Sequence, residues 1–374
     1  MIKKKIVLIG PAHPIRGGIA SFNDRLAQEY YSLGYEIIVY TFSLQYPDFL
    51  FPGSTQYSSE PAPTHINIHA KINSLNPYNW WRVGNEIKKL NPAQLIIAYW
   101  LPFMAPCLGS IARIVRKNRL TEIVCIAHNI VPHEKRIGDN LLTKYFVKAI
   151  DKWICMSSSV QSELKKYFHK NSVLVPHPIY DNYGTILDKK LACHCLSLPV
   201  KKYVLFFGLI RKYKGLDLLL QAMADTRIKT WDIHCIIAGE FYEDITPYLN
   251  IINKNKLQDR ITIHDQYIDA SDIPKYFSAA DIVVLPYRHA TQSGVTQLAY
   301  HFEKPMIVTA TGGLHEMVIH EETGYVVDKS PQAIADAIIR YYTDIQAHNL
   351  IDGIKAKKKE FTWQRLVEII DKNK

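Results

Sequence analysis

Residues Val204–Met223, VLFFGLIRKYKGLDLLLQAM, hold the pattern that decides the fold. An apolar run over Tyr203–Phe207 is followed by a glycine, a short loop and an amphipathic stretch over Leu216–Ala224. The run is typical of a buried strand and the stretch after it of a helix. The segment therefore predicts a strand–loop–helix unit.

The same alternation continues from one end of the chain to the other. It predicts an α/β fold with two doubly wound, Rossmann-like parallel sheets, each covered by helices. The expected strands are Lys5–Ile9, Glu36–Thr41, Leu95–Tyr99, Ile123–Ala127, Lys152–Met156, Tyr203–Phe207, His234–Ala238, Ile261–His264, Ile282–Leu285 and Met306–Thr309. The clearest helical stretches are Ala20–Leu33, Leu216–Ala224 and Pro331–Tyr342.

The chain divides near Val175–Gly184, VPHPIYDNYG, where Pro, Gly and Asn interrupt both periodicities. A length of 374 residues also suits two domains of roughly 150–200 residues each better than one core. We therefore expect an N-terminal domain over 1–180 and a C-terminal domain over 181–360. Ligands of such sheets bind beyond the carboxyl ends of the strands, so two facing sheets leave a cleft for a ligand.

The loop after Tyr203–Phe207 has the composition of a diphosphate site. Gly208 permits a sharp turn, and Arg211 and Lys214 stand three positions apart just before the next helix. Arginine forks onto phosphate oxygens and lysine adds a compact positive charge. The alternative is a pair of exposed loop charges without a ligand.

A second anion-binding loop is predicted at Thr291–Gly294, TQSG, between an expected strand and an expected helix. The first amides of that helix, near Gly294 and Val295, and the positive end of its dipole favour a phosphate. The polar residues expected to complete this cradle are Gln292, Ser293, Thr296 and Gln297. After the next strand come Gly312 and Gly313, whose backbone is expected to face the same cleft.

In the first half, Gly17 and Gly18 precede a helix, and His128 lies at the end of a strand. The glycine pair lets the backbone approach a phosphate or sugar at a helix N-terminus, although a simple tight turn would explain it as well. His128 is expected to face the ligand, and a buried structural histidine is the alternative. No DxD, HExxH or CxxC motif nominates a metal.

Composition indicates a globular protein with reduced thiols and an uneven charge. Six cysteines are scattered, several of them in strand-like runs, which favours free thiols in a cytoplasmic protein. The apolar stretch Leu90–Ala112 contains three prolines and several polar residues, so a bilayer span is not expected. Residues 1–180 carry 21 Lys and Arg against 11 Asp and Glu, whereas residues 181–374 carry 24 of each. A one-sided basic surface attracts the phosphates of anionic lipid, nucleic acid or a lipid-linked substrate, or is a solvated face without a partner.

Taken together, these segments resemble a glycosyltransferase of the GT-B fold, and most of all the retaining enzymes of family 4. The resemblance covers essentially the whole length. It rests on the opening GPAHPIRGGIASFNDRL, on AHN after a middle strand, on VLFFGLIRKYKGLDLLLQAM and on TATGGLHEMVIHEETGYVV. The family implies transfer of a sugar from a nucleotide donor to an acceptor, with retention and without a metal or other cofactor. It also implies an acceptor-binding first domain, a donor-binding second domain, and a C-terminal helix at about 361–374 that crosses back onto the first.

Carried over by position, the resemblance gives roles to individual residues. Arg211 and Lys214 would hold the donor diphosphate, and Gly17–Gly18 would approach it from the other domain. His128 would lie by the sugar, and a neighbouring backbone carbonyl would stabilise the developing oxocarbenium ion. The loop at Tyr267–Ile268 would flank the base of a UDP- or GDP-sugar.

Two positions depart from the family pattern. Family 4 usually has a Glu-x7-Glu pair around the TQSG segment, and the corresponding residues are Ala290 and Leu298. Gln297 would contact the ribose if the helix register shifts by one residue. The Arg that usually follows the glycine of the diphosphate loop is replaced by Leu209, with Arg211 two positions later. The chemistry does not require the acidic pair, because cations and a helix end can stabilise the leaving diphosphate.

Three other functions stay open: a nucleotide-sugar 2-epimerase on the same fold, an inactive nucleotide-sugar-binding homologue, and a nucleic-acid binder. The absent Glu pair favours the second, and no nucleic-acid motif supports the third. The expected partners are a nucleotide-sugar donor and a glycan or lipid-linked acceptor. The basic first half also predicts contact with an anionic membrane at its cytoplasmic face, in the synthesis of a surface polysaccharide or other glycoconjugate.

Overall fold

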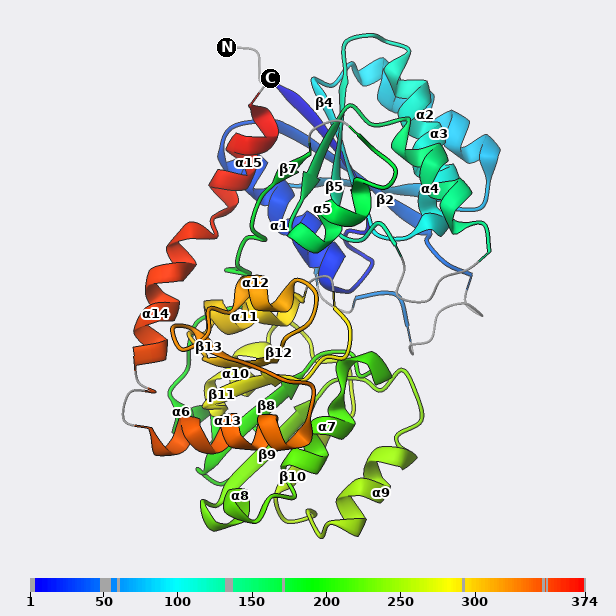
Figure 1. Ribbon diagram of the computed structural model, residues 1–374. Helices are drawn as coiled ribbons and strands as arrows, with labels where there is room; N and C mark the ends of the chain where they lie inside the picture. The colour runs from blue at the N-terminus through cyan, green and yellow to red at the C-terminus, as the bar shows by residue number, and fades with distance from the viewer. Residues whose placement is uncertain are drawn as a thin grey trace. The chain divides into compact units, whose positions relative to one another are not determined.

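A computed structural model describes residues 4–47, 55–58, 61–131, 137–169, 172–290, 293–344, 347 and 349–372. The chain forms two compact units, Met1–His177 with Trp363–Lys374 and Pro178–Thr362. Each contains one parallel sheet flanked by helices (Figure 1), which confirms the predicted α/β class.

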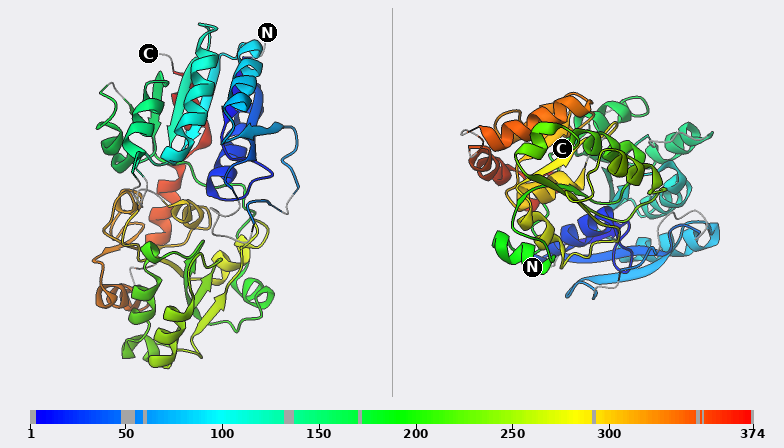
Figure 2. Two further views of the ribbon diagram at one scale, coloured as in Figure 1. Left: turned by 90° about the vertical axis from the view of Figure 1, so that its right-hand side faces the viewer. Right: turned by 90° about the horizontal axis from the view of Figure 1, so that it is seen from below.

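The first unit is built on a seven-stranded sheet with the order β3-β2-β1-β4-β5-β6-β7. Its strands are β1 (Lys5–Ile9), β2 (Glu36–Leu44), β3 (Asn67–Asn73), β4 (Gln94–Tyr99), β5 (Glu122–Ala127), β6 (Lys152–Cys155) and β7 (Val173–Leu174). Its helices are α1 (Gly18–Ser32), α2 (Pro77–Leu90), η2 (Pro102–Met104), α3 (Ala105–Arg116), α4 (Asp139–Val147), α5 (Ser158–Leu164) and α15 (Trp363–Asp371). Helices α2, α3 and α4 lie side by side on one face of the sheet, and α1 packs with α15 on the other (Figures 1 and 2).

The second unit is built on a six-stranded parallel sheet with the order β10-β9-β8-β11-β12-β13. Its strands are β8 (Lys202–Phe207), β9 (Ile233–Ala238), β10 (Ile261–His264), β11 (Ile282–Leu285), β12 (Met306–Thr309) and β13 (Gly324–Val327). Its helices are α6 (Lys189–Cys195), η3 (Lys212–Lys214), α7 (Leu216–Ala222), α8 (Thr226–Thr230), α9 (Thr246–Lys254), α10 (Ile273–Ala279), α11 (Gly294–His301), α12 (Leu314–Met317), α13 (Pro331–Thr343), α14 (Asn349–Lys357) and η5 (Lys358–Glu360).

The predicted strands form because their apolar runs are buried on both faces of a sheet. Every residue of β4 (QLIIAY) and β9 (IHCIIA) is buried, as expected for inner strands of a parallel sheet. All ten predicted strands are present: four have the predicted ends, five differ by one residue at one end, and β2 is three residues longer. The sequence analysis missed β3, β7 and β13, which are short or polar strands at the edges of the sheets.

Buried polar contacts hold α15 on the first unit. The ammonium of Lys152 donates to the carbonyl oxygens of Ile369, Ile370 and Lys372 at 2.9, 2.8 and 2.7 Å. A cation at the C-terminal end of a helix satisfies its last carbonyls and is favoured by the helix dipole.

Of the six free cysteines, five are buried and Cys195 is exposed.

Candidate functional site

The loop after β8 folds back onto the carboxyl ends of its own sheet. Gly208 has a φ of +94°, and a Cβ placed on it would lie 3.2 Å from Lys214 Nζ and 3.5 Å from Val295 Cγ2. Gly215 has a φ of +68°, and a Cβ there would lie 2.1 Å from the carbonyl oxygen of Pro286. The positive φ favours glycine at both positions, and at Gly215 the backbone of Pro286 also leaves no room for a Cβ. The result is that Lys214 is held beside the ends of β8 and β11.

Lys214 is a buried cation without an opposite charge beside it in the described part of the chain. The residue is only 8% exposed, and its Nζ lies 5.6 Å from the ring centroid of Tyr287. Within the described residues, no carboxylate forms an ion pair with it. Burial, and to a smaller extent the charge of Arg211, lowers the pKa of Lys214 to about 7. Because a buried charge is costly unless it is paired, an anionic ligand would stabilise the charged form.

Arg211 stands at the start of the same turn and is partly exposed. Its guanidinium lies over the ring of Tyr242, 5.0 Å from the centroid. No ion pair to Arg211 occurs in the part of the chain that the structure describes. The structure thus brings the two predicted cations together, and the effect of Arg211 on the pKa of Lys214 reflects their proximity.

Helix α11 begins at Gly294, as predicted, and Ser293 caps it. Ser293 Oγ accepts a hydrogen bond from the Val295 amide at 3.3 Å and lies 3.3 Å from the hydroxyl of Tyr287. Tyr287 therefore lies between the two loops: its ring is beside Lys214, and its hydroxyl is at the start of α11. The Thr296 amide also bonds to Ser293, through its carbonyl oxygen. Because Ser293 already accepts hydrogen bonds from the Val295 and Thr296 amides, fewer first-turn amides can bind an anion than expected. Gly294 is the exposed residue of this turn.

The other predicted donor residues occupy loops at the same edge of the sheet. Gly312 and Gly313 follow β12, and the Gly313 amide donates to the carbonyl oxygen of Ala290 at 3.3 Å. Tyr267, partly buried, and Ile268, buried, follow β10. In a parallel sheet both loops lie at the carboxyl edge, where ligands bind, although β9, β8 and β11 separate β10 from β12.

Of the two glutamines predicted at this site, the structure describes only Gln297. Gln292 lies outside the described residues. Gln297 is 1% exposed, and its Nε2 donates to Thr296 Oγ1 at 3.3 Å. Gln297 Oε1 is buried and has no hydrogen-bond partner among the described atoms. Its role at a ribose stays a prediction.

In the first unit, buried polar side chains shape the loop after β1. Asn23 Nδ2 donates to the carbonyl oxygen of Pro11 at 2.8 Å, and the Ala12 amide donates to Thr41 Oγ1 at 3.0 Å. Gly17 precedes the first residue of α1, and no atom lies within 4 Å of a Cβ placed on it. The Gly17–Gly18 backbone is therefore presented at the carboxyl edge with open space beside it.

His128 follows β5 and belongs to an aromatic cluster. Its amide donates to the carbonyl oxygen of Tyr99 at 2.8 Å. The ring of Phe22 packs edge-on against His128 at 5.0 Å and against His177 at 5.1 Å, between ring centroids. Burial, with a smaller contribution from His177, lowers the pKa of His128 to about 3. The imidazole is therefore neutral at pH 7, a form that both donates and accepts hydrogen bonds and suits a sugar hydroxyl.

The sequence analysis did not single out Asp24, which lies in α1 beside the loop after β1. Its Oδ1 accepts a hydrogen bond from the His13 amide at 3.4 Å. Desolvation raises the pKa of Asp24 to about 7, against the smaller opposite effect of the His13 bond. A partly buried carboxyl group with so perturbed a pKa is a candidate for ligand contact. Its sequence context, FNDRL, gives no sign of this burial.

Among the described residues, no group of three or more His, Cys, Asp or Glu side chains could hold a metal ion.

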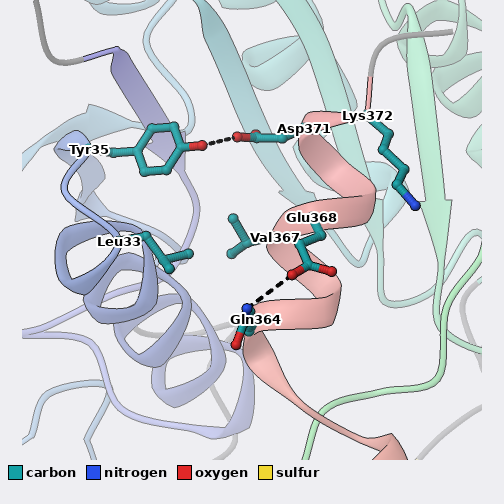
Figure 3. Close-up of a pocket in the computed structure, with 7 residues that line it drawn as sticks. All are labelled: Leu33, Tyr35, Gln364, Val367, Glu368, Asp371 and Lys372. Carbon is teal, nitrogen blue, oxygen red and sulfur yellow. Dashed lines mark hydrogen bonds between the residues drawn. The ribbon is translucent and has the colours of Figure 1, made fainter. Parts of the chain in front are cut away.

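A groove of about 440 Å³ in the first unit lies between Leu33, Tyr35 and α15 (Figure 3). It is at the amino end of β2, away from the loops that follow the strands, and the Tyr35 hydroxyl bonds there to Asp371. The groove therefore belongs to the docking of α15.

The fold and these loops define the class of the protein. Two doubly wound parallel sheets, one with a glycine loop and one with a basic loop at the carboxyl edge, correspond to GT-B glycosyltransferases. The model of Glycosyltransferase Family 4 matches residues 16–182, and that of Glycosyl transferases group 1 matches residues 201–344. The chain is a GT-B glycosyltransferase that resembles family 4.

Individual proteins are similar to this chain in fold or in sequence. A sucrose-phosphate synthase from Thermosynechococcus elongatus has a TM-score of 0.77 at 20% identity, over 98% of this chain and 97% of that chain. HepE of Anabaena, in complex with UDP and glucose, has a TM-score of 0.74 at 16% identity over 98% and 99% of the two chains. An uncharacterized glycosyltransferase of Methanocaldococcus jannaschii is 22% identical over 98% of this chain and 97% of its own length. A GDP-mannose:glycolipid 4-beta-D-mannosyltransferase of Xanthomonas campestris is 27% identical, in a match that spans half of each protein.

Proposed function

We propose that this protein transfers a hexosyl group from a UDP-sugar or GDP-sugar donor to an acceptor, with retention of configuration at the anomeric carbon. No metal ion or other cofactor takes part. The observation that carries the proposal is Lys214, a buried ammonium beside Arg211 with no carboxylate partner in the described residues. A diphosphate would supply the missing charge. The complex of HepE with UDP and glucose supports a nucleotide diphosphate as that ligand.

The proposed chemistry uses the cations to stabilise the leaving group. As the bond from the anomeric carbon to the diphosphate breaks, negative charge develops on the phosphate oxygen. Lys214, Arg211 and the Gly294 end of α11 lower the energy of that charge. The acceptor hydroxyl attacks from the same face, forms the new glycosidic bond and gives its proton to the leaving phosphate oxygen. Neutral His128 orients the sugar by hydrogen bonding.

The acceptor is proposed to be a glycan or a lipid-linked saccharide. The first unit, which would bind it, holds the positive excess of the chain. A glycolipid mannosyltransferase and WaaG, a glycosyltransferase involved in lipopolysaccharide biosynthesis, are among the similar proteins. An enzyme that glycosylates a lipid-linked acceptor would bind peripherally at the cytoplasmic face of a membrane. Its product would be a surface polysaccharide or another glycoconjugate. Among the described residues, no helix is long and apolar enough to span a membrane.

The test is an assay of sugar release and transfer with UDP- and GDP-sugars in the presence of EDTA. We expect turnover, and a product whose anomeric proton coupling in NMR shows the donor's configuration. Lys214→Met should abolish turnover, whereas Lys212→Met, at an exposed lysine of the same loop, should leave it intact. An inverted product or loss of turnover in EDTA would contradict the proposed mechanism. Binding without turnover would favour an inactive homologue, and conversion of the donor alone would favour an epimerase.

A further inference from the structure

The outer surface of α2, α3 and α4 combines exposed aromatic side chains with cations for which the described residues offer no carboxylate partner. The three helices form one layer, facing the viewer in the left view of Figure 2. At the start of α2, Tyr78 is 69% exposed and Trp81 is 57% exposed. Their rings stack at 5.8 Å with an interplanar angle of 23°, so they present one aromatic platform to solvent. Large aromatic side chains rarely stay this exposed without a partner.

The second ingredient of this surface is its charge. Exposed or partly exposed cations without a carboxylate partner among the described residues are Arg82, Lys88, Lys89, Lys117, Arg119, Lys144 and Lys148. The carboxylates within the three helices are Glu86 and Asp139. Glu86 is already engaged, by Lys71 at 2.7 Å and by the Tyr40 hydroxyl at 2.9 Å. The surface is therefore strongly positive.

Topology orders these groups along the surface. Each helix returns from the carboxyl edge of the sheet to its amino edge, because it connects two parallel strands. Tyr78 and Trp81 in α2, and the 73%-exposed Leu141 in α4, accordingly lie toward the carboxyl edge. Lys88–Lys89 and Lys117 lie at the opposite ends of their helices. The apolar groups are thus at the same edge as the loop of Gly17 and His128.

We propose that this surface, the outer side of α2, α3 and α4, docks on an anionic lipid bilayer. Amphipathic aromatic rings favour the headgroup region, and nearby lysines and arginines bind anionic headgroups. A nucleic acid would satisfy the cations but would leave the aliphatic side chain of Leu141 in water. Docking in this orientation brings the carboxyl edge of the first sheet toward lipid-linked saccharides. That consequence rests on the proposed acceptor, whereas bilayer binding is measured independently of it.

The test is co-sedimentation of the full chain with vesicles of phosphatidylcholine, and of equal parts phosphatidylcholine and phosphatidylglycerol. We expect binding to the anionic vesicles only. Each lysine near such a surface contributes about fivefold to binding, so Lys88→Glu with Lys89→Glu should weaken it at least about 25-fold. The control is Lys254→Glu with Lys256→Glu, the same charge change at exposed lysines of the second unit, which should bind nearly as well as wild type.

A second measurement tests the aromatic platform. Tryptophan fluorescence should be quenched by lipids brominated on the upper acyl chain, and Trp81→Phe should remove much of that quenching. Nucleotide binding measured on the same samples should be unchanged in every variant, which separates docking from the donor site. Failure to bind anionic vesicles, equal loss in the control, or quenching unaffected by Trp81→Phe would overturn the proposal. Binding of an oligonucleotide with the same variant pattern, without vesicle binding, would also overturn it.

Discussion

Binding of a nucleoside diphosphate should weaken as the pH rises above 7, because Lys214 loses its charge in the free protein. Burial and Arg211 lower the pKa of this lysine to about 7. A bound diphosphate adds opposite charge and raises that pKa. The charged form is therefore favoured in the complex, so binding takes up a proton at pH values between the free and the bound pKa.

The magnitude follows from linkage. Below pH 7 the lysine is protonated in both states and contributes no slope. Above pH 7 the dissociation constant should rise by up to tenfold per pH unit, which amounts to about 50-fold, or about 2.3 kcal/mol, between pH 7 and pH 9. The ligand adds no slope there, since a terminal phosphate has its second pKa near 6. The neighbouring Tyr213 and Tyr287 have raised pKa values, mainly through burial, and stay protonated over this range.

The assay is isothermal titration calorimetry with UDP or GDP at three pH values from 7 to 9, in buffers of different ionisation enthalpy. We expect weaker binding at each step and uptake of close to one proton at the upper pH values. Lys214→Arg keeps its charge throughout and should flatten the profile, and Lys212→Arg should keep the wild-type slope. A flat wild-type profile without proton uptake, or an unchanged slope in Lys214→Arg, would refute the reasoning.

Three further predictions concern single residues. Gly208→Ala should weaken nucleotide binding at least tenfold while circular dichroism stays native, because the added Cβ lies 3.2 Å from Lys214 Nζ and the φ of +94° disfavours alanine; unchanged binding would show that this approach is not needed. Lys152→Met should lower the free energy of unfolding in urea by about 1–3 kcal/mol, because three carbonyl oxygens at the end of α15 lose their donor, and equal stability would mean that water replaces the ammonium. Asp24→Asn should stabilise the protein by up to about 4 kcal/mol above pH 7 and little at pH 4. The folded-state pKa of Asp24 is raised to about 7, so wild-type stability from this group falls as the pH rises from 4 to 7; thermal melts with parallel pH profiles for both proteins would contradict it.

The sequence predicted the fold well where local pattern and burial agree. Inner strands such as β8 are continuous apolar runs, and the glycine after β8 marks the turn into the next helix. Edge strands were missed because they lack that run: β7 has only two residues, and β3 contains His69, Asn73 and Lys71. Neither length nor composition distinguishes such segments from loops.

The candidate site was predictable in its loops and less so in its electrostatics. Glycines and cations next to strand ends led to the prediction of a diphosphate site in the Arg211–Lys214 loop. The burial of Lys214 depends on Tyr287 and Val295, which a distant part of the chain brings to it. The pKa values of His128 and Asp24 likewise depend on neighbours and desolvation that no local spacing encodes. The capping of α11 by Ser293 has a local sequence signal, but its effect on the available amides appears only in the hydrogen bonds.

The most direct test of the central claim, a nucleoside diphosphate site at Arg211 and Lys214, is a set of thermal melts with UDP, GDP and ADP. A ligand at one hundred times its dissociation constant stabilises the protein by about 2.7 kcal/mol. We predict that one nucleotide raises the Tm of the wild type and of Lys212→Ala by several degrees, and that Arg211→Ala loses this rise. No shift with any of the three nucleotides, or the same shift in Arg211→Ala, would contradict it.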